Sequence, residues 1–154
     1  MGLFNQVVDV MKIVETISAQ LGSPITKDDY EIEDLGCPHV APKKLKKGYA
    51  AVYMFANDDN WLKIGKANEK SNARFTYQHY RISNHVSSLS KSLSNDNFYI
   101  KLGFSSNSPR EWVEKNTYRI NILLKAEKGR AATALVEAIL HYKFMPKYEK
   151  SIYR

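Results

Sequence analysis

The stretch Tyr49–Gly65, YAAVYMFANDDNWLKIG, decides the fold because two runs of β-prone residues flank one cluster of turn-prone residues. This order predicts an antiparallel hairpin. With a five-residue loop over 56–60, Tyr53 and Lys63 lie opposite one another on the same face of the hairpin. We expect this register, although a four-residue loop would place the two side chains on opposite faces.

A helix is expected directly after the hairpin. Ser71 and Asn72 are both good N-cap residues, and residues 73–82, ARFTYQHYRI, continue the helix from there. The next segment, 83–107, is rich in serine and asparagine. It predicts one short helix over 87–93, followed by a mobile stretch.

Two more elements are indicated near the C-terminus and one near the N-terminus. Residues 117–126 alternate polar and apolar side chains, which is typical of a half-buried strand. Residues 130–144, RAATALVEAILHYKF, predict a strong helix. Apolar residues at helical spacing predict another helix over 3–21. Prolines and charged residues in 23–47 indicate a largely irregular connection, so we expect the main domain to begin near Gly48.

Composition and charge suggest an intracellular protein with a polyanionic partner. The 154 residues carry a net charge of +7, and residues 1–36 hold two basic and seven acidic side chains against 21 and nine in the remainder. A basic body of this kind favours nucleic acid as a partner, although a merely solvated basic surface is common. The sequence has no apolar run long enough to cross a membrane and no secretory signal, so we expect a cytoplasmic location. The single Cys37 excludes a disulfide framework.

Glu137 is the most informative residue of the last predicted helix. It lies among apolar neighbours, where an ionised carboxylate is costly to bury without a partner such as a metal ion or an arginine. The alternative is that Glu137 points to water on a polar stripe with Thr133 and His141. Helical spacing leaves the two equally balanced.

Four groups together fit phosphodiester hydrolysis. A carboxylate such as Glu137 can hold one divalent cation, and Arg74 can neutralise charge on the scissile phosphate. Tyr53 or Lys63 can take the proton from the attacking water. A tyrosine has an ordinary pKa near ~10, so it needs a nearby cation to act as a base at neutral pH, and Lys63 and Lys66 are candidates.

Four short motifs resemble the GIY-YIG nuclease superfamily. They are AVY at 51–53, KIGK at 63–66, ARFTYQH at 73–79 and LVEAIL at 135–140. The order and spacing match the superfamily's GIY strand, YIG strand, arginine helix and glutamate helix. Ala51 replaces the first glycine, and Lys63 replaces the tyrosine of YIG, as it does in some restriction-type members.

The resemblance implies both a fold and a set of residue roles. The fold would be α/β (α+β), with a small, mainly antiparallel three-stranded sheet flanked by helices, an N-terminal helical extension over 1–47 and a nuclease domain over 48–154. Tyr53 would activate water, assisted by Lys63. The phosphate would be clamped by Arg74 and contacted by Lys66. Glu137 would bind one Mg²⁺ or Mn²⁺.

His79 follows Arg74 by five residues, where superfamily members often carry a tyrosine or histidine. It could orient water or phosphate, and the alternative is a histidine on the helix face that packs beside Phe75. The predicted activity is thus that of a metal-dependent endonuclease acting on DNA. Two alternatives are a non-catalytic nucleic-acid-binding module that keeps the fold, and an interaction protein whose N-terminal helix drives assembly into a homo-oligomer.

Overall fold

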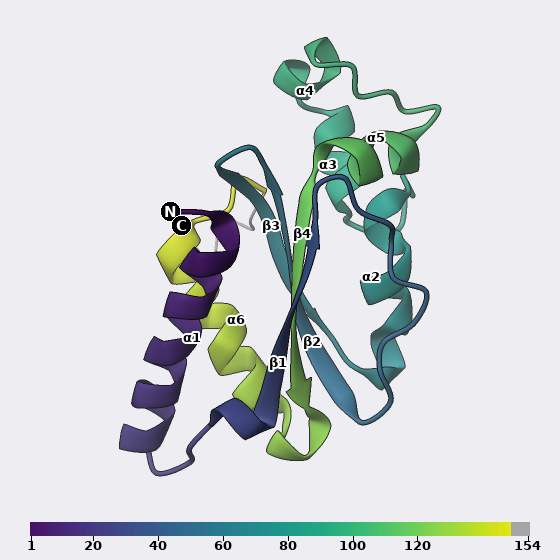
Figure 1. The fold of residues 1–154 in the computed structure, drawn as a ribbon. Coiled ribbons are helices and arrows are strands. Elements are labelled where there is room, and N and C mark those ends of the chain that lie inside the picture. Colours follow the sequence, from purple (N-terminus) through teal and green to yellow (C-terminus); the bar gives the residue numbers. More distant parts are fainter. Residues whose placement is uncertain (149–154) are drawn as a thin grey trace.

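The computed structural model describes residues 1–148 and has the expected α+β architecture, with helices on both faces of an antiparallel sheet (Figure 1). The described sheet has four strands, where the sequence predicted three. The strands are β1 Tyr30–Gly36, β2 Tyr49–Asn57, β3 Asn60–Ala67 and β4 Tyr118–Lys125, and they are arranged in the order β1-β4-β2-β3. β3 is therefore an edge strand.

The helices divide between the two faces of the sheet (Figure 1). α1 (Leu3–Gln20) and α6 (Arg130–Phe144) cover the face that we call the α6 face. The opposite face, which we call the α2 face, carries the shorter helices: α2 Asn72–Thr76, α3 Leu89–Ser94, α4 Asn97–Lys101 and α5 Pro109–Asn116. Short 3₁₀ turns occur at η1 Lys27–Asp29, η2 Glu69–Ser71, η3 Gln78–Tyr80 and η4 Ala126–Lys128.

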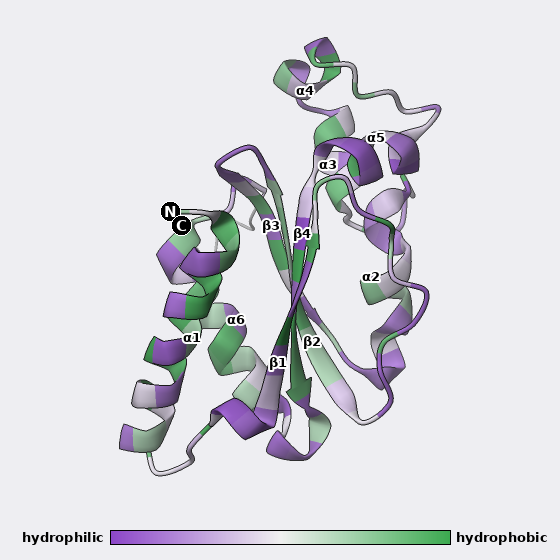
Figure 2. Ribbon diagram, viewed as in Figure 1, coloured by the Kyte–Doolittle hydropathy of each residue, from purple (hydrophilic) through white to green (hydrophobic). Residues whose placement is uncertain are grey.

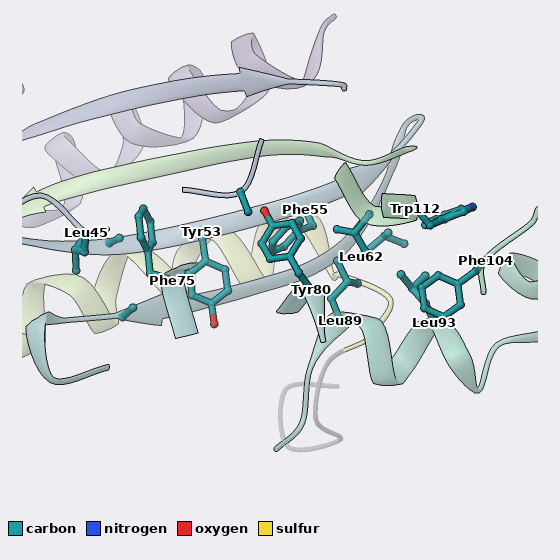
Figure 3. Packing of buried hydrophobic residues seen from close by; sticks show 14 of the residues in the cluster. Leu45, Tyr53, Phe55, Leu62, Phe75, Tyr80, Leu89, Leu93, Phe104 and Trp112 are labelled. Carbon is teal, nitrogen blue, oxygen red and sulfur yellow. The ribbon is translucent and has the colours of Figure 1, made fainter. Parts of the chain in front are cut away.

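Each face of the sheet has its own core. On the α6 face, Val52 and Ile122 from the strands pack in one cluster with Met11 of α1 and Leu140 of α6. Figure 2 shows the hydrophobic inner side of α1 and the hydrophobic centre of the sheet. The core of the α2 face is rich in aromatic residues, as Figure 3 shows, and includes Tyr53, Phe55, Phe75, Tyr80 and Trp112.

The expectation that 23–47 is irregular is wrong for its central part. β1 pairs with β4 from Tyr30 opposite Leu124 to Gly36 opposite Arg119. The acidic residues hide the alternation, because Tyr30 and Ile32 pack against the α6-face core while Glu31 is exposed. β1 is thus a strand of the same sheet as β2, β3 and β4, and α1 packs on one face of that sheet. A functional boundary at residue 48 stays a prediction.

The hairpin forms as predicted, but its register differs. Gly65 lies opposite Tyr53, and Lys63 lies opposite Phe55. The strands extend to Asn57 and Asn60 and leave a two-residue turn, while a bulge beside Phe55 shifts the register by one further residue. The expected direct pairing of Tyr53 with Lys63 is therefore wrong. Both still belong to the α2 face, because Tyr53 and Phe55 lie two residues apart on β2.

Three further expectations need correction. The helix expected to run through 73–82 breaks at Tyr77, whose φ of −140° leaves the helical region, and resumes as η3. The stretch expected to be mobile contains α4, which Asp96 caps by accepting a hydrogen bond from the Phe98 N–H. β4 is buried on both faces, not half-buried, because it is a central strand.

Candidate active site

Tyr53 lies on β2 with its ring directly over Gly65 of the neighbouring strand. A Cβ at position 65 would lie 2.6 Å from Tyr53 Cζ and nearer still to Tyr53 Oη. Real Cβ atoms do not approach other atoms so closely, so a residue without a side chain is required here. The glycine of KIGK therefore makes room for the hydroxyl end of the candidate catalytic tyrosine.

His79 holds the hydroxyl group of Tyr53. Its Nε2 lies 2.7 Å from Tyr53 Oη, and its Nδ1 accepts a hydrogen bond from the Leu89 N–H at 3.1 Å. Burial, followed by the charges of Lys63, Arg119 and Arg74, lowers the pKa of His79 well below its ordinary value. The ring is therefore neutral, its proton is on Nε2, and His79 donates to Tyr53 Oη.

His79 was predicted to contact phosphate or substrate, and the structure places it inside the protein. The side chain is buried, and both ring nitrogens have partners within the chain. The ring centroid lies 4.9 Å from that of Tyr53 and 5.7 Å from that of Phe55. A direct contact between His79 and substrate stays a prediction, whereas its contact with Tyr53 is part of the fold.

Arg119 is a buried residue that the sequence analysis did not single out. It is 1% exposed and donates three hydrogen bonds: from Nε to Asn121 Oδ1 at 2.9 Å, from Nη1 to Tyr80 Oη at 2.8 Å and from Nη2 to the Phe75 carbonyl at 2.7 Å. Asn121 in turn donates to Glu33 Oε2 at 3.1 Å. Arg119, Asn121 and Lys125 are the polar residues of β4, so alternation assigned Arg119 to a solvent-exposed face and gave no signal of its burial.

The guanidinium group of Arg119 also lies against aromatic rings of the α2-face core. Its Cζ is 4.8 to 5.8 Å from four ring centroids, those of Tyr53, Phe55, Phe75 and Tyr80. A cation at these distances is attracted by the faces of the rings. Arg119 therefore places a permanent positive charge behind Tyr53.

Tyr80 and His39 form a second hydrogen-bonded pair with the opposite polarity. His39 Nδ1 donates to the Thr117 carbonyl at 2.9 Å, so its Nε2 is the acceptor for Tyr80 Oη at 2.8 Å. Burial lowers the pKa of His39 and raises the pKa of Tyr80, although Arg119 opposes the second shift. Tyr80 is therefore a proton donor held between two basic residues.

Glu137 is on the opposite face of the sheet, paired with Lys66. The Lys66 Nζ lies 2.9 Å from Glu137 Oε1, and Glu137 is 9% exposed. Thr133 and His141, which share its side of α6, are also buried, so the alternative of a solvated polar stripe is wrong. The partner expected for Glu137 was a metal ion or an arginine, and a lysine supplies the opposite charge instead.

Lys63 influences groups on both faces of the sheet. Its charge lowers the pKa of His79 on the α2 face and also that of His141 on the α6 face. Burial is the largest cause of the lowered pKa of His141, and Glu137 opposes it. β3, which carries Lys63, is an edge strand of the described sheet.

A cleft of about 580 Å³ lies where β2 begins and β3 ends. Four cationic side chains line it: Lys66, Lys70, Arg74 and Arg130. The cleft thus brings together two of the predicted phosphate-binding residues, Lys66 and Arg74. Tyr53, Lys63, His79 and Glu137 are not among the residues that line it. The ion pair with Lys66 nevertheless joins Glu137 to the cleft wall.

The chemistry of the donors limits any metal site. Residues 1–148 contain no cluster of three or more histidine, cysteine, aspartate or glutamate side chains arranged to hold a metal ion. Glu137 offers one carboxylate, and Lys66 contacts one of its oxygens. Such a donor set fits a hard divalent cation whose remaining ligands are water and substrate phosphate, as Mg²⁺ often has.

Comparisons with protein-family models, with curated proteins and with solved structures gave no match. The resemblance to GIY-YIG nucleases therefore rests on the four motifs and stays a prediction. Among the described helices, none has the length and apolar character needed to span a membrane.

Proposed function

We propose that this protein is a metal-dependent endonuclease that hydrolyses phosphodiester bonds in DNA. The observation that carries the proposal is the ion pair between the buried Glu137 and Lys66, at the wall of a cleft that also contains Arg74. A carboxylate can hold a divalent metal ion next to a phosphate group, and neighbouring cations can neutralise the charge of that phosphate.

The cations of the cleft have clear roles in this proposal. Arg74 and Lys66 bind the scissile phosphate and neutralise the charge that grows on it during attack. Glu137 would hold Mg²⁺ or Mn²⁺ once Lys66 contacted the phosphate instead of Oε1. Such a cation, when bound, would supply charge stabilisation to the phosphate.

Tyr53 accepts the proton of the attacking water in this proposal. The hydrogen bond from His79 Nε2 and the buried charge of Arg119 lie beside Tyr53, where they can stabilise a negative charge on Oη against the cost of burying it. Lys63 lies opposite Phe55 on the same face, and its charge acts on His79, the hydrogen-bond partner of Tyr53. Tyr53 is 2% exposed, and Gly65 presents no side chain beside its Oη.

A non-catalytic nucleic-acid-binding module is the second candidate. One observation favours it: Tyr53, the proposed proton acceptor, is buried. In such a module the cationic cleft would bind phosphates, and the Lys66–Glu137 pair would serve only to position Lys66. The two candidates differ in whether a divalent cation allows DNA to be cut.

The deciding experiment incubates the purified protein with plasmid, linear and branched DNA in Mg²⁺, Mn²⁺ or chelator. We expect cleavage that requires a divalent cation. Glu137→Gln should abolish the cleavage while DNA binding in chelator is retained. Glu111→Gln is the matched control, because Glu111 is an exposed glutamate on α5 and its loss should leave cleavage unchanged.

Lys63→Met is a second variant for the same assay. If Lys63 assists Tyr53, cleavage should fall and its dependence on pH should shift to higher pH. Undiminished cleavage would leave Lys63 without a chemical role. Absence of cleavage by the unmodified protein under all of these conditions would overturn the proposed function in favour of the binding module.

A further inference from the structure

The cationic cleft combines two kinds of surface. Its charged residues include Lys70 on η2 and Arg130 at the start of α6, which the proposed chemistry does not use. Between the charges the lining is apolar, with Tyr49 and Ala50 from β2, Ala67 from β3 and Ala126 from η4. A site meant for a phosphate group alone does not need this apolar lining.

The wall of the cleft is held by hydrogen bonds within the protein. The Asn68 side chain accepts from the Lys70 N–H at 2.9 Å, and Ser71 Oγ accepts from the Asn68 N–H at 2.8 Å. Glu69, a carboxylate in the lining, accepts from the Gly48 N–H at 3.2 Å. η2 is therefore fixed at both ends, and the negative charge of Glu69 is directed toward a backbone donor.

We propose that this cleft binds one nucleotide of an unpaired nucleic-acid strand, next to the phosphate that Arg74 and Lys66 hold. The inference rests on the proposed function for the identity of that neighbouring phosphate. Lys70 and Arg130 contact the backbone phosphate of the bound nucleotide, and the apolar lining receives its sugar and base. The substrate class is therefore DNA with a single-stranded segment.

The size of the cleft supports an unpaired nucleotide over a base pair. A volume of about 580 Å³ is within the range that encloses one small molecule. A base inside a duplex is stacked and paired, so it cannot enter a cleft of this kind unless it leaves the stack. Single-stranded DNA presents its bases without that cost.

The test measures binding in chelator, so that cleavage plays no part. Fluorescence anisotropy compares a labelled single-stranded oligonucleotide with the duplex of the same sequence at several salt concentrations. The variants are Lys70→Ala and Arg130→Ala. Lys143→Ala is the control, because Lys143 is exposed on the last turn of the same helix as Arg130 and is not among the residues that line the cleft.

We expect the unmodified protein to bind the single strand more tightly than the duplex. Each of the two cleft variants should weaken binding and lower the slope of log K against log salt by about 0.7, which is the value for one lost phosphate contact on a single strand. Lys143→Ala should change neither quantity.

Two results would overturn the inference: cleft variants that bind like Lys143→Ala, or a duplex that binds at least as tightly as the single strand. Each of these results can be distinguished from failure of the proposed function. A protein that binds single strands as expected and never cuts DNA contradicts only the nuclease proposal. A protein that cuts DNA with unchanged activity and binding in the cleft variants contradicts only the nucleotide site.

Discussion

Substitution of Gly65 by alanine tests the reasoning about Tyr53 directly. The added methyl group would occupy the space of the Tyr53 ring, with its carbon 2.6 Å from Cζ. The ring must therefore move, and the 2.7 Å hydrogen bond from His79 Nε2 to Tyr53 Oη is lost. Because both groups are buried, water does not easily replace the lost partner.

The expected cost follows from three contributions. Overpacking in a buried site costs about 1–3 kcal/mol. Loss of the buried hydrogen bond adds about 1–3 kcal/mol, because His79 Nε2 and Tyr53 Oη are left without each other. Replacement of glycine by alanine also lowers the conformational entropy of the unfolded chain, which stabilises the folded protein by about 0.4–1 kcal/mol. We therefore expect Gly65→Ala to lower the free energy of unfolding by about 1–6 kcal/mol.

Urea unfolding of four proteins measures this effect: the unmodified chain, Gly65→Ala, Tyr53→Leu and the double variant. Leucine at position 53 removes the ring that the new methyl group would strike. The double variant should therefore lose less stability than the sum of the two single variants. Additive losses would refute the inference that Gly65 is required by the Tyr53 ring.

Gly65→Ala also has an expected effect on function. If Tyr53 accepts the proton of the attacking water, displacement of its ring by about 1 Å should reduce cleavage by on the order of 100-fold. Binding of DNA in chelator should change little, because Gly65 does not line the cationic cleft. Full cleavage by a folded Gly65→Ala protein would exclude Tyr53 as the base.

Two further predictions concern stability. Arg119→Met leaves three buried acceptors without their donor. The free energy of unfolding, measured by urea unfolding, should therefore fall by about 3–5 kcal/mol. A loss below about 1 kcal/mol would contradict the role of these three hydrogen bonds. The pKa values of His39, His79 and His141 are all lowered by burial, so the unfolded chain binds more protons below pH ~6.5. The contribution of these histidines to the free energy of unfolding should be complete above that pH. It should fall as pH decreases toward the folded pKa values, by up to about 1.4 kcal/mol per histidine and pH unit. An unchanged urea midpoint between pH 7.5 and pH 5 would contradict this prediction.

The elements with strong periodicity could be predicted from the sequence. α1 and β4 appear where the spacing of apolar residues indicates them, α6 appears where helix-forming residues predict it, and β2 and β3 appear where two β-prone runs flank a turn-prone cluster. β1 was not predicted, because its acidic residues match the composition of a loop. Its pairing with β4 joins residues that are about ninety positions apart, such as Tyr30 and Leu124, and no local pattern reveals a partner at that separation.

The candidate site was predictable in its residues and not in its arrangement. The sequence singled out Glu137 as a carboxylate in need of a partner, and the partner lies 71 positions away at Lys66. It did not single out Arg119, because alternation alone suggested that this residue faces solvent on a half-buried strand. Whether β4 is central or at an edge decides that question, and strand order is a property of the whole fold.

The edge position of β3 explains how one short stretch can serve both halves of the candidate site. Along KIGK, Lys63 and Gly65 belong to the α2 face, where Tyr53 and His79 lie. Ile64 and Lys66 belong to the α6 face, where Lys66 meets Glu137.

In a central strand these two faces would be separated by the neighbouring strands. At an edge they meet along one rim. A phosphate held by Arg74 and Lys66 at this rim would have the tyrosine on one side and the carboxylate on the other. The alternation of the strand thus provides the separation between proton acceptor and metal ligand that the proposed hydrolysis requires.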